Sequence, residues 1–251
     1  MRNVPLDALD HLPIDVLPIG TDYPPDFLLK PHAHRRAQLL YGATGVMQVV
    51  TAEGSWTVPA DRAVLIPAGV THEVLMGGVT TWSLYIEPQA VPWWPAACEV
   101  VEVGPLLREL LREANTFDVH YDMAGRDGTV IKLALEELQR LSPAPFSITL
   151  PREDPLRALC RDYLARPHLA VTNADWARST AMSERTFVRR FRASTGVSPA
   201  TWRSRALLLA SLPLLPMHTV TQVAVTLGYS SPAAFTAAFN RAFGAPPSRF
   251  T

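Results

Sequence analysis

Short hydrophobic runs separated by glycine, proline and aspartate fill the chain up to about residue 88 and predict β-strands there. The runs are rich in valine, isoleucine, leucine, threonine and tryptophan. Regularly spaced short strands with turn signals between them are typical of an all-β barrel or jelly roll. The predicted strands are Ala37–Tyr41, Val46–Thr51, Ser55–Val58, Ala63–Ile66, His72–Leu75 and Thr80–Ile86.

The hydrophobic pattern then changes to the period of an amphipathic helix. One helix is predicted to begin at Pro105 and a second to cover Thr129–Leu141. Both stripes fit packing against the barrel, and either fits dimerisation; periodicity does not choose between the two. The stripe of the first helix consists of Leu106, Leu107, Leu110 and Leu111.

A proline-rich connector, Ser142–Pro151, separates these elements from a purely helical remainder in which Pro155 suits a helix start. We therefore expect an α+β chain with two domains. The predicted parts are a barrel over residues 1–92, a helical dimerisation region over 93–141, the connector over 142–151 and an all-α domain over 152–251.

The overall composition is that of a globular protein, with 48% hydrophobic and 18% charged residues. No apolar run approaches the roughly 18 residues that a membrane span needs, and the N-terminal residues lack the pattern of a signal peptide. Cys98 and Cys160 cannot form a disulfide framework and fit a reducing cytoplasm. We expect no membrane contact.

A net charge of zero conceals opposite charges in the two halves. Residues 1–150 hold ten Lys and Arg against 18 Asp and Glu, whereas residues 151–251 hold 13 against five, and all 13 are arginine. Such asymmetry favours a polyanionic partner for the basic half, although a solvated basic face would have the same composition. Arginine is the side chain suited to bidentate contact with phosphate and guanine.

Two stretches of the basic half share one pattern, 48 residues apart. In each, a short helix ends near a small residue, a serine can cap the next helix, and two phenylalanines follow four residues apart. The pairs are Phe187/Phe191 and Phe235/Phe239. A two-helix unit with a tight turn is a common DNA-reading device, and two copies are stronger evidence than one.

With these motifs, residues 155–251 resemble the DNA-binding domain of the AraC/XylS family of transcription regulators, in which a long helix joins two helix-turn-helix units. The chain departs from the family pattern in two places. Pro213 and Pro216 lie at the end of the linking helix, which must therefore end early. Thr251 stands where family members usually carry an arginine. The matching residues are Ala177, Met182, Ser183, Phe187, Arg190, Phe191, Gly196, Ser198, Pro199 and Arg205, then Val223, Ala224, Leu227–Ser230, Phe235, Phe239, Phe243, Gly244, Pro247 and Phe250.

Helical geometry predicts which residues of the first unit face DNA. At about 100° per residue, the two phenylalanines set the core side and Arg185, Val188, Arg189 and Arg192 cluster opposite. The resemblance makes the first three of these the major-groove positions, where each arginine can take guanine O6 and N7 and the valine a thymine methyl. For any single arginine, phosphate contact is an equal alternative. Arg190 lies off this face, toward phosphate or an internal partner. The predicted contacts of this unit are Ser183, Arg185, Thr186, Val188, Arg189, Arg190 and Arg192.

The same offset places Ala233, Thr236, Ala237 and Asn240 on the face of the second unit. This face carries no cationic side chain, and only Thr236 and Asn240 on it can form hydrogen bonds. We therefore expect a phosphate clamp with weak base readout, in which the hydroxyls near Ser231 and the helix N-terminus hold a phosphate. The predicted contacts of this unit are Ser231, Ala233, Thr236 and Asn240.

The N-terminal half resembles a cupin, the small β-barrel that commonly serves as sensor domain in this family. The residues from Pro31 to Gln38 with Gly45 follow the first cupin motif, and those from Pro67 to His72 the second. In metal-bearing cupins, histidines corresponding to His32, His34 and His72 hold Zn, Ni, Fe or Mn together with a glutamate. Here Gln38 occupies the glutamate position, and Asp61 stands where glycine is frequent.

The barrel histidines therefore have two interpretations. As an effector pocket, His32, His34, Gln38 and His72 contact a small molecule and no cofactor is required; as a metal site, His32, His34 and His72 bind a divalent transition metal. The first belongs to a ligand-responsive transcription regulator whose partners are promoter DNA, a small-molecule effector, a second copy of the chain and RNA polymerase. The second belongs to a cupin metalloenzyme, a dioxygenase or isomerase. Gln38 and the double helix-turn-helix both argue against this second interpretation.

Overall fold

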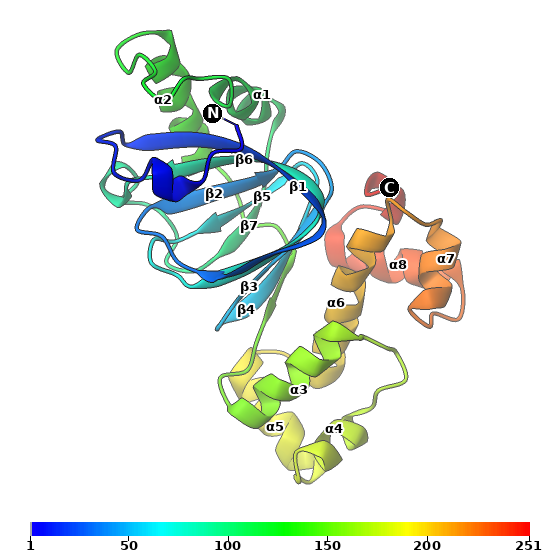
Figure 1. Cartoon of the computed structure of the whole chain (residues 1–251). Helices are drawn as coiled ribbons and strands as arrows, with labels where there is room; N and C mark the ends of the chain where they lie inside the picture. Colours follow the sequence, from blue (N-terminus) through cyan, green and yellow to red (C-terminus); the bar gives the residue numbers. More distant parts are fainter. Residues whose placement is uncertain (1) are drawn as a thin grey trace. The chain divides into compact units, whose positions relative to one another are not determined.

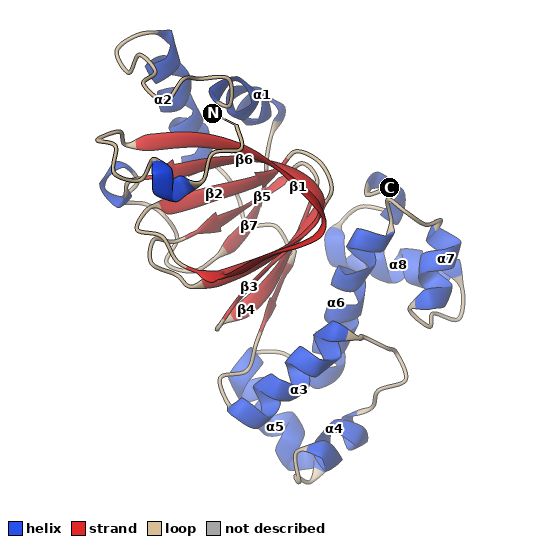
Figure 2. Cartoon of the chain, in the orientation of Figure 1, coloured by secondary structure: helices blue, strands red, loops and turns tan. Residues whose placement is uncertain are grey.

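The computed structural model describes residues 2–251 and divides the chain into two compact units (Figures 1 and 2). The first comprises the residues up to Thr51 together with Val58–Ala144. The second comprises Ala52–Thr57 and Pro145–Thr251. Each unit is a structure in its own right, a barrel with helices in the first and a helical domain in the second.

The first unit is a nearly closed antiparallel β-barrel, as predicted. Its strand order is β7-β5-β2-β6-β3, and β1 pairs with β6 along most of its length. The central strand β6 therefore bonds to β1, β2 and β3. The strands are β1 (Val16–His32), β2 (Ala37–Gly42), β3 (Val46–Thr51), β5 (Arg62–Ile66), β6 (His72–Ile86) and β7 (Glu99–Glu102).

Two strands predicted separately, His72–Leu75 and Thr80–Ile86, are one bent strand in the structure. The residues between them include Gly77 and Gly78, and Gly78 has a φ of 67°, a conformation that glycine adopts without strain. A Cβ atom on Gly45 would lie 2.4 Å from the carbonyl oxygen of Gly78, so the neighbouring turn also requires glycine. The glycines that indicated a break therefore permit a bend.

Strand β1 was not predicted, because its sequence contains four prolines and a glycine. Proline has no N–H for the ladder and is confined to edge strands and bulges. The prolines of β1 are tolerated because β6 is the one named strand with which β1 pairs in the described residues, its second edge holding only a bridge from Gly20 to Arg2, and the register shifts between Pro25 and Phe27 and again between Leu29 and His32.

Helices α1 (Pro105–Ala114) and α2 (Arg126–Gln139) close the hydrophobic core of the first unit. The predicted leucine stripe divides in two: Leu107 and Leu111 are buried against the barrel, whereas Leu106 is 51% exposed and Leu110 is half-buried. Leu110 packs against the edge of the hydrophobic core, so packing on the barrel accounts for three of the four leucines and leaves Leu106 facing outward.

The predicted connector contains a short strand, β8 (Ser147–Thr149), within the second unit. It pairs antiparallel with β4 (Gly54–Pro59) from Gly54 to Trp56. The indole Nε1 of Trp202 donates a hydrogen bond of 2.7 Å to the Thr149 carbonyl. The sequence predicted an irregular linker here because three residues are too short a run to register as a strand.

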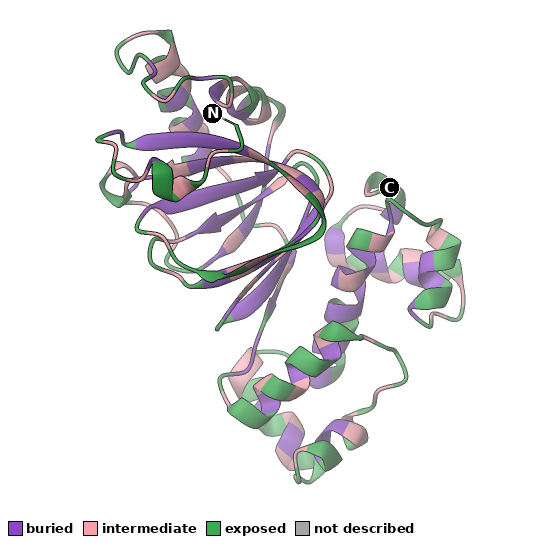
Figure 3. Cartoon of the chain, viewed as in Figure 1, coloured by how far each residue is buried: buried purple, intermediate pink, exposed green. Residues whose placement is uncertain are grey.

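A long central helix organises the rest of the second unit. Helix α6 contacts α3, α5 and α8, and much of it is buried (Figure 3). It ends at Ser211 and gives way to a 3-10 turn over Leu212–Leu214, which confirms the early stop predicted from Pro213 and Pro216. The helices are α3 (Asp154–Ala165), α4 (Asn173–Ser179), α5 (Glu184–Thr195), α6 (Pro199–Ser211), α7 (Val220–Thr226) and α8 (Pro232–Phe243).

None of the helices within residues 2–251 is long and apolar enough to cross a membrane.

Candidate nucleic-acid interface and histidine cluster

Two helix-turn-helix units, α4–α5 and α7–α8, repeat the same local chemistry. Helices α4 and α7 each begin with a capping box, Thr172 with Asp175 and Thr219 with Gln222. Helices α5 and α8 are both 12 residues long and lie 48 residues apart in the sequence. The repeat inferred from sequence is therefore a repeat of structure.

The second helix of each unit is held at both ends in the same way. Ser183 caps α5 by accepting a hydrogen bond from the Thr186 N–H, and Ser231 caps α8 by accepting one from the Ala234 N–H. Both helices stop at a glycine with a left-handed φ, Gly196 at 79° and Gly244 at 70°. The turn before α8 is one residue longer than the turn before α5.

Four phenylalanines fix the orientation of these two helices. Phe187 and Phe191 of α5 are fully buried, as are Phe235 and Phe239 of α8. Around the first pair, Trp176 of α4 and Trp202 of α6 complete an aromatic cluster with ring centroids 5.7–6.0 Å apart. Burial of the phenylalanine side turns the opposite face of each helix to solvent.

The solvent face of α5 carries an unpaired cluster of arginines. Arg185, Arg189 and Arg192 are exposed, and Val188 between them is half-buried. Among residues 2–251, none of these three guanidinium groups has a carboxylate or hydrogen-bond partner in the structure. Free guanidinium groups in a row on a helix surface have the geometry for phosphate and guanine edges.

Arg190 lies away from this face and has an internal partner. Its Nη2 pairs with the Glu153 carboxylate just before α3. Nearby, the Arg152 N–H donates to the Ser194 hydroxyl at 3.1 Å, so the back of α5 binds the end of the connector. Of the two roles left open for Arg190, the structure therefore shows the internal one.

The capping hydroxyls are engaged as well. The Ser183 hydroxyl donates to the Thr186 hydroxyl at 3.0 Å and accepts from the Thr186 N–H at 3.3 Å. Ser231 accepts from the Ala234 N–H at 3.1 Å. These residues sit at helix starts, where they order the N-terminal backbone of each helix.

The corresponding face of α8 presents small neutral side chains. Ala233, Ala237 and Asn240 are exposed, and Thr236 is half-buried. The structure thus places the predicted residues of both units on solvent faces of equivalent helices.

Arg203 of α6 was not predicted, yet it positions the first unit. It is 9% exposed, its Nη2 donates to Asn173 Oδ1 at 2.9 Å, and its guanidinium lies 4.8 Å from the centre of the Trp176 ring. Burial lowers the pKa of Arg203. No sequence signal distinguishes it from the exposed arginines, because α6 is buried on several sides.

In the first unit, the barrel gathers the predicted histidines. The His32 and His72 rings lie 4.4 Å apart between centroids, and those of His34 and His72 lie 5.2 Å apart. The Tyr85 ring approaches His34 edge-on at 5.3 Å. His72 is buried, His34 half-buried and His32 exposed, so the cluster runs from surface to interior.

A chain of polar contacts ties this cluster together. His34 Nδ1 lies 2.6 Å from the Arg36 carbonyl and its Nε2 lies 3.0 Å from Gln38 Oε1. The Gln38 amide donates to the Ser83 hydroxyl at 3.2 Å. Burial lowers the pKa of His34, and it lowers that of His72 to about 4, with the neighbouring histidines adding to the shift. His72 is therefore neutral at pH 7.

The arrangement does not fit the predicted metal site. Both ring nitrogens of His34 already face oxygen atoms of the protein, and Nδ1 of His72 lies 2.8 Å from the Val70 carbonyl. Within residues 2–251, no group of three or more His, Cys, Asp or Glu side chains is placed to hold a metal ion. His32, His34 and His72 meet through their rings, and their hydrogen bonds go to backbone carbonyls and to Gln38.

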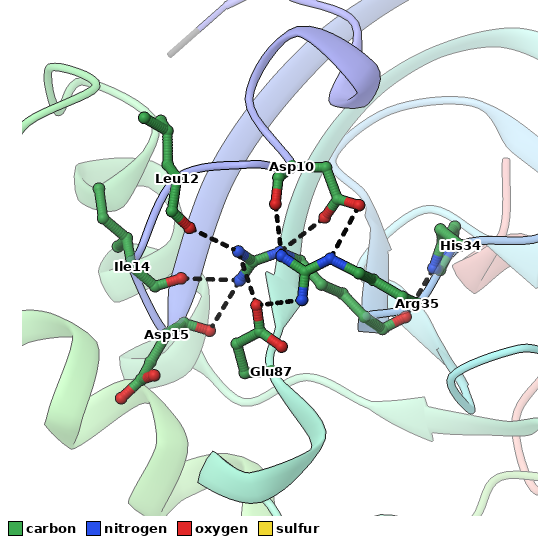
Figure 4. A network of polar contacts seen from close by, with 8 residues as sticks. Asp10, Leu12, Ile14, Asp15, His34, Arg35 and Glu87 are labelled. Atoms are coloured by element: carbon green, nitrogen blue, oxygen red, sulfur yellow. Dashed lines mark hydrogen bonds and ion pairs between the residues drawn. The ribbon is translucent and has the colours of Figure 1, made fainter.

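A buried arginine beside the cluster, also missed from sequence, anchors the N-terminal segment (Figure 4). Arg36 is fully buried; its Nη1 donates to the Ile14 carbonyl at 2.7 Å and its Nη2 to the Leu12 carbonyl at 3.1 Å. The carboxylates of Asp10 and Glu87 pair with the Arg36 guanidinium, and each also pairs with Arg35. Because the Arg36 carbonyl faces His34, this network borders the histidine cluster.

Comparison with known proteins identifies relatives of both units. Residues 14–120 match the model of the AraC-like ligand binding domain, and residues 176–251 match that of a helix-turn-helix domain. The chain is 30% identical to the HTH-type transcriptional regulator NimR of Escherichia coli K12 over 221 residues, 87% of this chain and 81% of that protein. It is 30% identical to the HTH-type transcriptional regulator RipA of Corynebacterium glutamicum over 138 residues, 54% of this chain and 40% of that protein.

Solved structures with related folds were also found. ToxT from Vibrio cholerae is 10% identical, with 94% of this chain and 98% of that chain covered and a TM-score of 0.40. The DNA-binding domain of AdpA, solved in complex with a target DNA, is 33% identical over 39% of this chain and 90% of that chain, with a TM-score of 0.37.

Proposed function

The chain belongs to the AraC/XylS family of transcription regulators, and we propose that its two helix-turn-helix units bind promoter DNA while its barrel holds the small molecule that adjusts this binding. Membership of the family makes the chain a ligand-responsive regulator, with double-stranded DNA and a small-molecule effector as partners. As a regulator of transcription it would act in the bacterial cytoplasm, where the chromosome lies.

The unpaired arginine face of α5 is the observation that carries the DNA-binding proposal. Arg185, Arg189 and Arg192 stand in one exposed row without a carboxylate partner among the described residues. A stabilising role within the protein would require partners, whereas contact with DNA requires free groups. The excess of 13 arginines over five acids in residues 151–251 adds long-range attraction to a polyanion.

We assign different tasks to the two reading helices. Arg185 and Arg189 of α5 take guanine edges, and Val188 between them packs on a base methyl. Helix α8 contributes less discrimination between bases. Its Ser231 and its N-terminus contact the DNA phosphates, and its Thr236 and Asn240 face the major groove. Ser183 and Thr186 position the start of α5 against a phosphate, and Arg190 orients α5 through Glu153.

For the effector, we propose the cluster of His34, Gln38 and His72, with His32 at its surface end. The cluster offers neutral imidazoles, an amide and a hydroxyl, and no carboxylate lies among these groups. Such a set offers hydrogen-bond donors and acceptors to a small molecule with hydrogen-bonding groups. We assign the protein no catalytic role, because the alternative of a cupin metalloenzyme needs a free ring nitrogen on His34, and both of its ring nitrogens face oxygen atoms of the protein.

We further propose a homodimer formed by residues 93–141, through the exposed Leu106 of α1 and the exposed part of the half-buried Leu110 beside it. The proposed parts remain a sensor barrel over 1–92, the dimerising helices over 93–141, a connector over 142–151 and the DNA-binding domain over 152–251. RNA polymerase is proposed as a further partner at the promoter.

Selection of binding sites from random DNA by the full-length protein tests the proposal. We expect an enriched site with a guanine-containing box. The double variant Arg185→Ala/Arg189→Ala should lose the enrichment, whereas Arg161→Ala, which removes an exposed arginine of α3, should keep it. Failure of the native protein to enrich any sequence, or enrichment that survives in the double variant, would contradict the assignment.

A further inference from the structure

We propose that α8 recognises thymine through the C5-methyl group, so that the second box of the binding site is specified by methyl contacts instead of hydrogen bonds. This inference rests on the proposed function, since it requires both units to lie on DNA. It assigns Ala233 and Ala237 as specificity-determining residues and Thr236 as their companion.

The structural repeat identifies which residues of α8 enter the groove. Helices α5 and α8 share their length, serine cap, buried phenylalanine pair and glycine stop at a constant offset of 48 residues. Ala233 therefore stands where Arg185 does, and Ala237 where Arg189 does. Both alanines are exposed, so their methyl groups are free to meet a partner.

The chemistry of Ala233 and Ala237 excludes the readout that Arg185 and Arg189 of α5 use. An alanine side chain is a single methyl group that neither donates nor accepts a hydrogen bond. Thr236, in the place of Val188, is half-buried and adds another methyl group. Arg241 follows Asn240 by one residue and so lies about 100° further around α8. When the face of Ala233 and Ala237 enters the major groove, the side chain of Arg241 points toward the sugar-phosphate backbone of the DNA.

The short side chains of α8 also determine how closely the helix can approach the bases of the major groove. Without arginines between helix and bases, the backbone of α8 can approach the floor of the groove closely. In the major groove, the thymine C5-methyl is the feature that an apolar side chain recognises, and alanine and the threonine methyl are among its usual partners. Cytosine offers no methyl group at that position, so contact with Ala233 or Ala237 distinguishes thymine from cytosine.

Replacement of thymine by deoxyuridine tests the methyl contact, because it removes the C5-methyl group and changes no hydrogen-bonding group of the base. Each thymine of the second box in the selected site is replaced singly, and the affinity of the full-length protein is measured at fixed salt. Burial of one methyl group is worth about 0.8 kcal/mol, so each contacted thymine should lose roughly fourfold in affinity. Equal affinities for thymine and deoxyuridine throughout the second box would overturn the inference.

The variants Ala233→Gly and Ala237→Gly identify the protein side of the contact. Each removes one methyl group, so the penalty for deoxyuridine at the thymine it contacts should disappear. Glycine also weakens the helix, but the measurement compares two DNAs on the same protein, and any loss of folded protein cancels. A penalty that persists unchanged in both variants would overturn the assignment of these alanines.

A gain of specificity completes the test. The variant Ala233→Arg/Ala237→Arg gives α8 the two arginines of α5, and selection with it should return guanine in the second box. An unchanged second box would contradict the claim that these positions face the bases. If the native protein selects no site at all, the proposed DNA-binding function fails; a guanine-containing first box with a methyl-insensitive second box overturns only the present inference.

Discussion

At the scale of single residues, Arg189 and Asn240 occupy faces of equivalent helices but should differ in their effect on specificity. Arg189→Ala removes a bidentate donor for guanine and is expected to relax base preference in the first box at a cost of about 1–3 kcal/mol. Asn240→Ala should weaken binding less, and evenly across sequences. Affinities for the selected site and for single-base variants of it measure both effects.

The matched control for this pair is Arg189→Lys, which keeps the charge but loses the planar fork. It should retain most of the nonspecific affinity and lose part of the guanine preference, because lysine still reaches guanine O6 and N7 but lacks the planar fork. Loss of preference in Asn240→Ala with none in Arg189→Ala would reverse the assignment of the two helices.

His72 predicts a pH dependence of the stability of the barrel. Its pKa of about 4 in the folded protein lies below the ordinary 6.5, so the unfolded chain binds a proton first as the pH falls. The contribution of His72 is complete above pH 6.5 and is lost progressively toward pH 4, by up to about 3 kcal/mol. Urea unfolding of the native protein and of His72→Gln between pH 7 and 4.5 measures it.

The His72→Gln variant should be less sensitive to pH than the native protein, whatever its stability at pH 7. His11→Gln, which changes an exposed histidine, provides the control and should follow the native curve. Identical pH dependence in the native protein and in His72→Gln would show that the buried imidazole does not govern this window.

Sequence reasoning at this scale succeeded for residues whose role depends on the local helix. The exposed face of α5 follows from helical periodicity around Phe187 and Phe191, and the structure places Arg185 and Arg189 there. It missed Arg36 and Arg203, because their partners come from segments distant in the chain. For the same reason, an internal partner for Arg190 could only be named as an alternative to phosphate, and Glu153 could not be identified as that partner.

At the scale of secondary-structure elements, α1 offers two kinds of leucine with opposite expected effects. Leu106 is exposed and Leu110 packs at the edge of the core, so the variant Leu106→Glu/Leu110→Ala, which places a charge only at the exposed position, should remain folded and dissociate the proposed dimer. Leu107 is 1% exposed, and Leu107→Glu should unfold the barrel instead, because it buries a charge. Sedimentation and circular dichroism of the full-length proteins separate the two outcomes.

A native protein that sediments as a monomer at micromolar concentration would refute the dimer. A double variant that is folded and still dimeric would place the interface elsewhere than on this face of α1.

The elements that could be predicted have a regular hydrophobic period, and those that were missed lack one. Strand β3 was predicted over its full length, Val46–Thr51, and α1 from its first proline. Strand β1 was missed because its prolines resemble breakers, although pairing with β6 on one edge accommodates them. Strand β8 is stabilised by β4 and Trp202, contacts that no local pattern reveals.

At the scale of the whole molecule, the charge separation predicts how DNA affinity responds to salt. With 13 arginines in residues 151–251 and several phosphates contacted, log K should fall linearly with log salt concentration, by roughly 0.9 for each phosphate neutralised. Titration of the full-length protein against its selected site at several salt concentrations gives the slope. Affinity that is independent of salt would argue against a phosphate-bound complex.

Helices α5 and α8 should differ in how they contact guanine in the major groove, and methylation interference measures this difference at each guanine of the site. The selected site is methylated at guanine N7, and the DNA that the full-length protein still binds is compared with the unbound DNA. The two helices should contact major-groove segments about 34 Å apart. We predict strong interference at guanines in the first box, where Arg185 and Arg189 approach N7, and none in the second box. Equal interference in both boxes, or interference confined to the second, would contradict the account.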